Sequence, residues 1–122
     1  MTDGQVEWAI EWFVKGNGER PLRTFLAGLT GRNYDEAIAL MEMLGKWGNR
    51  LGSPNSEALG DGLFELRGHQ VRIFYMFRPG RRIILFDGIV KKKDRIPSSV
   101  LDVVRKYQQE VRAMDAKGKR GP

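Results

Sequence analysis

The middle of the chain constrains the fold most, because it contains three strand-like runs separated by very short turns. Val71–Arg78 is the densest run of β-forming residues in the sequence. Leu63–Arg67 precedes it across Gly68, and Arg82–Val90 follows it across the turn Pro79-Gly80. Because short connections favour neighbouring antiparallel strands, these runs predict an antiparallel meander.

The central run separates into two sets of side chains, because alternate residues of a strand point to opposite faces. One set is apolar and is predicted to be core: Val71, Ile73, Tyr75 and Phe77. The other set mixes apolar side chains with arginines and predicts the floor of a concave, basic site: Arg72, Phe74, Met76 and Arg78. Since Tyr75 points with the core set, no hydroxyl chemistry is expected from it.

The flanking segments predict one further strand and three helices. They are a strand over Val6–Val14, a short helix from Pro21, a helix from an Asn33 N-cap to Trp47, and a last helix from Pro97 through Val111. Glu36 stands three residues after Asn33, as in a capping box. Residues 49–62 predict a connector. The tryptophans Trp8, Trp12 and Trp47 fall on periodic apolar faces and are predicted core residues.

The predicted order is β-α-α-β-β-β-α. It is an α+β fold in which a twisted, mainly antiparallel sheet carries two N-terminal helices on one face, with a C-terminal helix. A chain of 122 residues favours one domain. Residues 1–113 are predicted to form that domain. Residues 114–122, basic and without periodicity, are predicted to be a disordered tail that is dispensable for folding.

Charge is distributed unevenly along the chain. Residues 1–62 carry 6 Lys/Arg against 9 Asp/Glu, and residues 63–122 carry 15 against 6. The asymmetry suits a face for a polyanion, although a solvated basic surface with a basic tail explains the composition as well.

Several functional classes lack their sequence signals. The absence of cysteine excludes a disulfide scaffold and a thiolate metal site. No P-loop, dinucleotide fingerprint, histidine–carboxylate cluster or nucleophile elbow occurs, so neither a metal nor a cofactor is expected. A signal peptide and an apolar run of the roughly 18 residues that span a bilayer are also missing, which predicts a cytoplasmic protein without membrane contact.

The ordered motif over residues 63–112 resembles the RelE/ParE toxin superfamily, and within it the HigB or phage Gp49-like branch. The residues that carry the resemblance are Leu63-Phe64-Glu65-Leu66-Arg67, Arg72-Ile73-Phe74-Tyr75, Phe86-Asp87-Gly88-Ile89-Val90-Lys91-Lys92-Lys93 and Pro97. The resemblance implies a type II toxin that cuts messenger RNA, usually on the ribosome. It also implies a small antitoxin that neutralises the toxin in a hetero-oligomer. Because this partner would have to cover a basic groove, we expect it to be acidic or amphipathic.

The resemblance also implies roles for individual residues. Arg72 matches the arginine that contacts the scissile phosphate, and Arg67 matches the basic position that ends the preceding strand. Lys91, Lys92 and Lys93 match the basic cluster after the last strand of the motif. The chain departs from the family pattern at Asp87, where a histidine is usual, and at Leu63 and Glu65, where some relatives have lysines. The tyrosine that some members carry in or before the last helix has no clear match.

Metal-independent RNA cleavage requires a base for the 2′-hydroxyl, cations for the phosphoryl oxygens and an acid for the leaving oxygen. Arg67 and Arg72 suit the cationic role because a guanidinium binds phosphate bidentately. Glu65 is a candidate base, and we expect the arginines to lower its pKa; alternatively, it forms a structural salt bridge to them.

Lys92, within the lysine run, is an alternative catalytic group. His69 lies in a turn, where histidines are usually incidental. The remaining candidate RNA contacts are Lys91, Lys93, Arg78, Arg95 and His69.

Two other functions stay open at this stage. One is a ParE-like toxin that performs no chemistry and inhibits a protein such as DNA gyrase. The other is a degenerate protein that binds an antitoxin without cleaving RNA. This alternative is suggested by the absence of the family's histidine and tyrosine. The arginine pair and the lysine run together favour RNA cleavage.

Overall fold

The computed structural model describes residues 7–92 and 95–119. Its elements are β1 (Ala9–Trp12), α1 (Pro21–Ala27), α2 (Gly31–Trp47), the single 3-10 turn η1 (Gly48–Arg50), β2 (Ser56–Gly60), β3 (Leu63–Arg67), β4 (Val71–Arg78), β5 (Arg82–Val90) and α3 (Ser98–Lys119). The predicted α+β class is confirmed, and so is the antiparallel meander of β3, β4 and β5.

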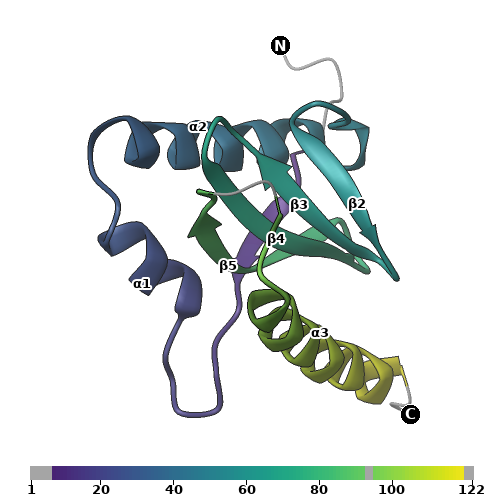
Figure 1. Ribbon diagram of the computed structural model, residues 1–122. Coiled ribbons are helices and arrows are strands. Elements are labelled where there is room, and N and C mark those ends of the chain that lie inside the picture. The colour runs from purple at the N-terminus through teal and green to yellow at the C-terminus, as the bar shows by residue number, and fades with distance from the viewer. Residues whose placement is uncertain (1–6, 93–94, 120–122) are drawn as a thin grey trace.

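One five-stranded sheet runs through the molecule in the order β1-β5-β4-β3-β2 (Figure 1). It is mixed, because β1 pairs in parallel with β5 while all other neighbours are antiparallel. Strand β2 lies inside the segment 49–62, so the prediction of a plain connector there was wrong. The sequence Ser-Glu-Ala-Leu-Gly has no β-branched or aromatic residue. It forms a strand by pairing with β3 at the sheet edge.

Helices α1 and α2 cover one face of the sheet, as predicted (Figure 1). Pro21 occupies the first turn of α1, where its missing N–H is not needed. Buried leucines of both helices pack against the predicted core set of β4 and against β5; they include Leu22, Leu26, Leu40 and Leu44. Trp8 and Trp12 pack at the margin of this core, but Trp47 is 43% exposed, so its assignment to the core was wrong.

Helix α3 covers the other face and forms a second core. Phe74 and Met76 of β4 are buried there with Val104 and Val111 of α3. The prediction that this face of β4 is the floor of an open basic site was therefore wrong over most of its length. It failed because the apolar stripe of α3 needs a partner surface, and the strand supplies it.

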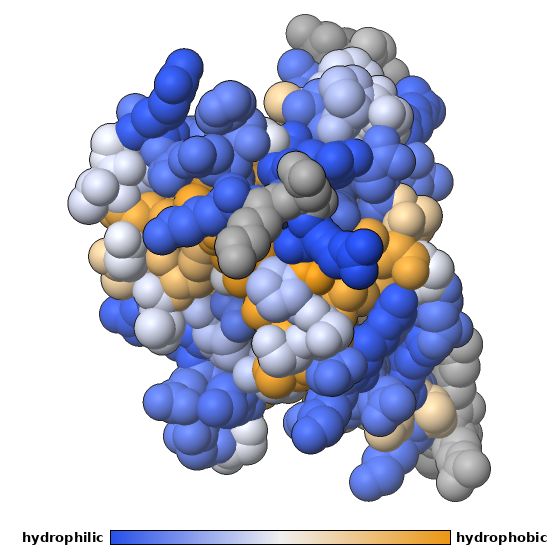
Figure 2. All heavy atoms as spheres, viewed as in Figure 1, coloured by the Kyte–Doolittle hydropathy of each residue, from blue (hydrophilic) through white to orange (hydrophobic). Residues whose placement is uncertain are grey.

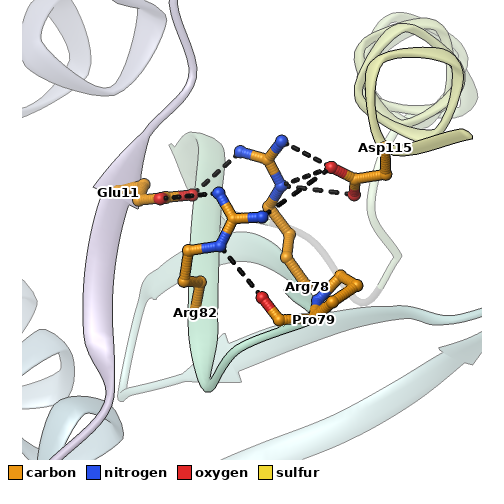
Figure 3. A network of polar contacts seen from close by, with 5 residues as sticks. All are labelled: Glu11, Arg78, Pro79, Arg82 and Asp115. Carbon is orange, nitrogen blue, oxygen red and sulfur yellow. Dashed lines mark hydrogen bonds and ion pairs between the residues drawn. The ribbon is translucent and has the colours of Figure 1, made fainter. Parts of the chain in front are cut away.

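The C-terminal helix is longer than predicted. It continues to Lys119, so residues 114–119 are helical instead of disordered, and residues 120–122 lie outside the described part of the chain. Figure 3 shows the reason: Asp115 on α3 accepts hydrogen bonds from Arg78, with 2.6 Å between Nη2 and Oδ1. Glu11 of β1 binds Arg78 and also Arg82, at 2.9 and 3.3 Å. This network joins α3, the β4–β5 hairpin and β1.

Two further boundaries differ from the predictions. Strand β1 covers only Ala9–Trp12 of the expected Val6–Val14 range, and Val6 is outside the described residues. Helix α2 begins at Gly31 after Thr30, so Asn33 is not its N-cap and Glu36 forms no capping box. Across residues 7–92 and 95–119, no helix is long and apolar enough to cross a membrane.

We expect Asp115→Ala to lower the free energy of unfolding by about 1–3 kcal/mol, because Arg78 would lose its main partner in a largely buried position. Truncation after Ala113 should cause a similar or larger loss, contrary to the prediction that the tail is dispensable. Asp102→Ala, at an exposed site of the same helix, is the matched control. Urea unfolding followed by circular dichroism measures all three. Equal stability of the Asp115 and Asp102 variants would show that the network does not hold α3.

Candidate functional site

Glu65, Arg67 and Arg72 come together where β3 and β4 end at their shared turn. Arg67 stands directly opposite Arg72, and Glu65 stands opposite Phe74, so the three charged side chains lie on the α3 face of the sheet. Helix α3 packs over Phe74 and residues beyond it. The charged group therefore occupies the end of this face, next to the second core.

Arg72 is held firmly. Its Nη1 donates hydrogen bonds to the carbonyl oxygens of Gly68 and Val71, at 2.8 and 3.0 Å. Its Nε lies 3.2 Å from Oε1 of Glu65, but the N–H is not directed at that oxygen, so the contact is an ion pair without a hydrogen bond. Both side chains are only 8% exposed. Arg72 therefore has a structural role in addition to its predicted place at the basic site.

Glu65 is a buried carboxylate among cations. Burial raises its pKa and outweighs the opposing fields of Arg67, Arg72 and Lys91. The expectation that the arginines lower this pKa was therefore wrong, since the desolvation of a buried strand position could not be read from residue types. A carboxylate with a raised pKa is a stronger base at neutral pH than an exposed glutamate.

Glu36, which the sequence suggested only as part of a capping box, instead fixes the turn between β3 and β4. Its carboxylate accepts hydrogen bonds from the backbone N–H groups of His69, Gln70 and Val71, the shortest at 2.8 Å. Burial alone would raise the pKa of Glu36, but these donors lower it. A side chain on Gly68 would collide with Glu36, so the glycine permits this close approach. No local sequence pattern indicates such a contact across 33 residues.

Basic side chains gather around this turn and the end of β5, and we call this surface the basic edge: Arg67, His69, Arg72, Lys91, Lys92 and Arg95. Lys91 is brought to the turn by its backbone N–H, which donates to the carbonyl of Gln70 at 2.7 Å. Lys93 lies outside the described residues. In Figure 2 strongly hydrophilic atoms gather over the centre of this face, with apolar atoms exposed between them.

Two of the pockets formed by the described residues open on the basic edge. The first, of about 460 Å³, is lined by Arg67, Arg72 and His69 together with Glu36. The second, of about 350 Å³, lies between Lys91, Lys92 and Arg95, with Ile89 and Pro97 as apolar walls. Cationic walls around concave surfaces suit a phosphate backbone, and apolar floors suit bases or ribose.

One candidate RNA contact lies elsewhere. Arg78 is at the opposite end of β4 from Arg72, about 20 Å away for six residues of strand. It is engaged by Asp115 and Glu11, and these hydrogen bonds, opposed by burial, raise its pKa. Arg78 therefore belongs to the structural network of Figure 3 and not to the basic edge. Among the described residues, no group of three or more His, Cys, Asp or Glu side chains is arranged to hold a metal ion.

Comparison with known proteins fits this architecture. The model of the phage-derived Gp49-like protein family matches residues 24–109, more than half of the chain. The chain belongs to this family. A chain of the RelBE2 toxin–antitoxin complex from Mycobacterium tuberculosis is similar in structure to this Gp49-like protein, with a TM-score of 0.53 and 14% sequence identity. The match covers 70% of the Gp49-like chain and 100% of the other. No curated protein matches.

These findings confirm the resemblance that the motif over residues 63–112 indicates. The family is the phage Gp49-like branch named from the motif, and the structural match shows a RelE-like fold.

We expect Arg72→Ala to destabilise the protein by about 3 kcal/mol, because it removes two hydrogen bonds to backbone carbonyls and leaves Glu65 without its nearest cation. Arg67→Ala should cost at most about 1 kcal/mol, since that side chain is 39% exposed and 3.8 Å or more from its acidic partners. Urea titrations of both variants test the contrast. If the two lose equal stability, Arg72 is not the structural member of the pair.

Proposed function

We propose that this Gp49-like protein is the toxin of a type II toxin–antitoxin system and a metal-independent endoribonuclease acting on messenger RNA. The observation that carries the proposal is the buried Glu65 carboxylate, whose pKa burial raises, 3.8 Å from Arg67 and 3.2 Å from Arg72. Both arginines line an open basic pocket. A base, an accessible phosphate-binding cation and a second positive charge within one cluster are groups that cleavage through the 2′-hydroxyl needs.

In the proposed reaction, Glu65 takes the proton from the 2′-hydroxyl, and the 2′-oxygen attacks the adjacent phosphorus. Arg67, the more exposed guanidinium, binds the phosphoryl oxygens, and Arg72 keeps Glu65 in place while adding positive charge. The bond from phosphorus to the 5′-oxygen breaks, and that oxygen takes up a proton, for which Lys92 is the proposed donor. The products are a 2′,3′-cyclic phosphate and a 5′-hydroxyl. Lys91, Lys93 and Arg95 are proposed to bind the flanking phosphates, as is His69.

An antitoxin is the proposed partner. The structural neighbour is a chain of a toxin–antitoxin complex, and the basic edge of this chain offers a complementary surface to an acidic or amphipathic segment. Such a segment would occlude the pockets that RNA needs. Ribosome-bound messenger RNA is the proposed substrate because the family resemblance implies it, and cytoplasmic location follows from that substrate.

We expect Glu65→Gln to slow RNA cleavage about a hundredfold or more, because the amide cannot accept the proton. Arg67→Ala should also slow it about a hundredfold by removing a phosphate contact that strengthens in the transition state. Arg23→Ala, an exposed arginine of α1, is the control and should cut at the parental rate. The measurement is primer extension on messenger RNA after induction, with circular dichroism to confirm folding.

The same experiment distinguishes RNA cleavage from inhibition of a protein target. A folded Glu65→Gln protein that still arrests growth, without cuts in messenger RNA in either variant or parent, contradicts cleavage and favours a toxin that binds a protein such as gyrase. Relief of growth arrest by an acidic partner encoded beside the toxin gene supports the toxin–antitoxin part independently of the chemistry.

A further inference from the structure

A third pocket lies beyond the basic edge, at the side of β5. Strand β1 pairs with β5 only as far as Leu85, so the rest of β5 has no strand on that side among the described residues. The pocket, of about 370 Å³, is formed there between the β1–α1 loop, α1, β5 and α3. We call it the edge pocket. Its volume is within the range of small-molecule sites.

The edge pocket combines an acceptor, a donor and an aromatic wall. Asp87 Oδ1 accepts a hydrogen bond from the N–H of Gly88 at 2.8 Å, and Oδ2 has no hydrogen bond from any described residue. Burial raises the pKa of Asp87. Across the pocket stand the ammonium of Lys15, which ion-pairs with Glu19 at 3.1 Å, and the phenol of Tyr107 on α3. Hydrogen bonding to Glu19 raises the pKa of Lys15, which keeps it a cation.

Phe25 supplies the aromatic wall, and its position depends on Gly88. A side chain at residue 88 would meet the Phe25 ring at 2.5 Å, so glycine lets the ring lie against β5. The Tyr107 ring stacks on Phe13, with ring centroids 4.5 Å apart, and this contact holds it in position. The rings of Phe25 and Tyr107 therefore form two walls of the pocket, and Asp87 lines it from β5.

The edge pocket is also close to the proposed catalytic group. Asp87 stands opposite Phe74 on β4, and Phe74 stands opposite Glu65 on β3. Because neighbouring strands are about 4.8 Å apart, Asp87 and Glu65 are separated by about 10 Å across the same sheet face. The second pocket of the basic edge, with Ile89 and Lys91, continues from Asp87 along β5 toward Arg72. Adjacent nucleotides of one RNA strand can bridge such a distance.

We propose that the edge pocket binds a guanine base of the RNA, with the Asp87 carboxylate accepting from guanine N1–H and N2–H, Lys15 donating to O6, and Phe25 or Tyr107 contacting the ring. Guanine is the base that presents two adjacent donors beside an acceptor, which matches a carboxylate next to an ammonium. Single-stranded RNA is commonly recognised by such edge contacts and aromatic rings. The inference rests on the proposed function and adds base preference to it.

The first test measures binding without cleavage. Guanosine 5′-monophosphate is titrated into the full chain and followed by NMR, in parallel with the adenosine, cytidine and uridine monophosphates. We expect guanosine monophosphate to bind about tenfold more tightly than the others, with shifts at Asp87 and Tyr107. Equal affinity for the four nucleotides, or no binding, overturns the proposal.

Variants localise the effect. Asp87→Asn replaces one acceptor by a donor and should abolish the guanine preference, and Lys15→Met should weaken it. Asp35→Asn, an exposed position on α2, is the matched control and should bind as the parent does. Guanine preference that survives in folded Asp87→Asn protein excludes the edge pocket as the base site.

The second test reads the RNA cuts, and it separates this inference from the proposed function. Parent protein that cuts beside guanine, with the preference lost in Asp87→Asn, supports both. Parent protein that cuts RNA with no base preference retains the cleavage function and overturns the edge-pocket proposal. Guanine binding that depends on Asp87, in a protein that cuts no RNA, supports the pocket as a guanine-nucleotide site and contradicts the nuclease.

Discussion

The structure depends on one constraint: β4 is buried on both faces of the sheet. Six consecutive residues, Val71–Met76, are each at most 6% exposed. Helices α1 and α2 cover one side, and α3 covers the other. A charged residue in such a strand must find its partners within the protein, because water cannot solvate it. Arg72 is that residue, and the carbonyls of Gly68 and Val71 with the Glu65 carboxylate are its partners.

The properties of the candidate site follow from this burial. Glu65 stands beside Arg72, on the strand paired with β4, and shares its low exposure, so desolvation dominates its protonation and raises its pKa despite three nearby cations. Arg67 is one residue before the turn and remains accessible. The end of the β3–β4 pair lies at the boundary of the core. It therefore carries a buried base, Glu65, next to an accessible cation, Arg67. Glu36 then holds the turn through three backbone donors, which keeps the wall of the pocket in place.

Local periodicity in the sequence predicted part of the structure correctly. The meander, the helix positions and the cross-strand placement of Arg67 and Arg72 follow from alternation and short turns. It failed where a long-range contact decides. Strand β2 exists through pairing with β3, and the last turns of α3 are held by Arg78. Alternation alone predicted an open basic face on β4. Nothing in the run Arg-Ile-Phe-Tyr-Met-Phe-Arg indicates that α3 covers this face. The pKa direction of Glu65 was missed for the same reason.

Glu65 combines burial with a raised pKa between two arginines, and direct titration of its side chain tests this combination. The carboxyl carbon can be followed by ¹³C NMR in the folded protein and assigned by its loss in Glu65→Gln. We expect a titration midpoint above the ordinary value of 4.5, and a further rise in Arg67→Ala, where one cation that favours the carboxylate is removed. A midpoint at or below 4.5 would rule out Glu65 as the base, because it would then be a salt-bridged structural carboxylate.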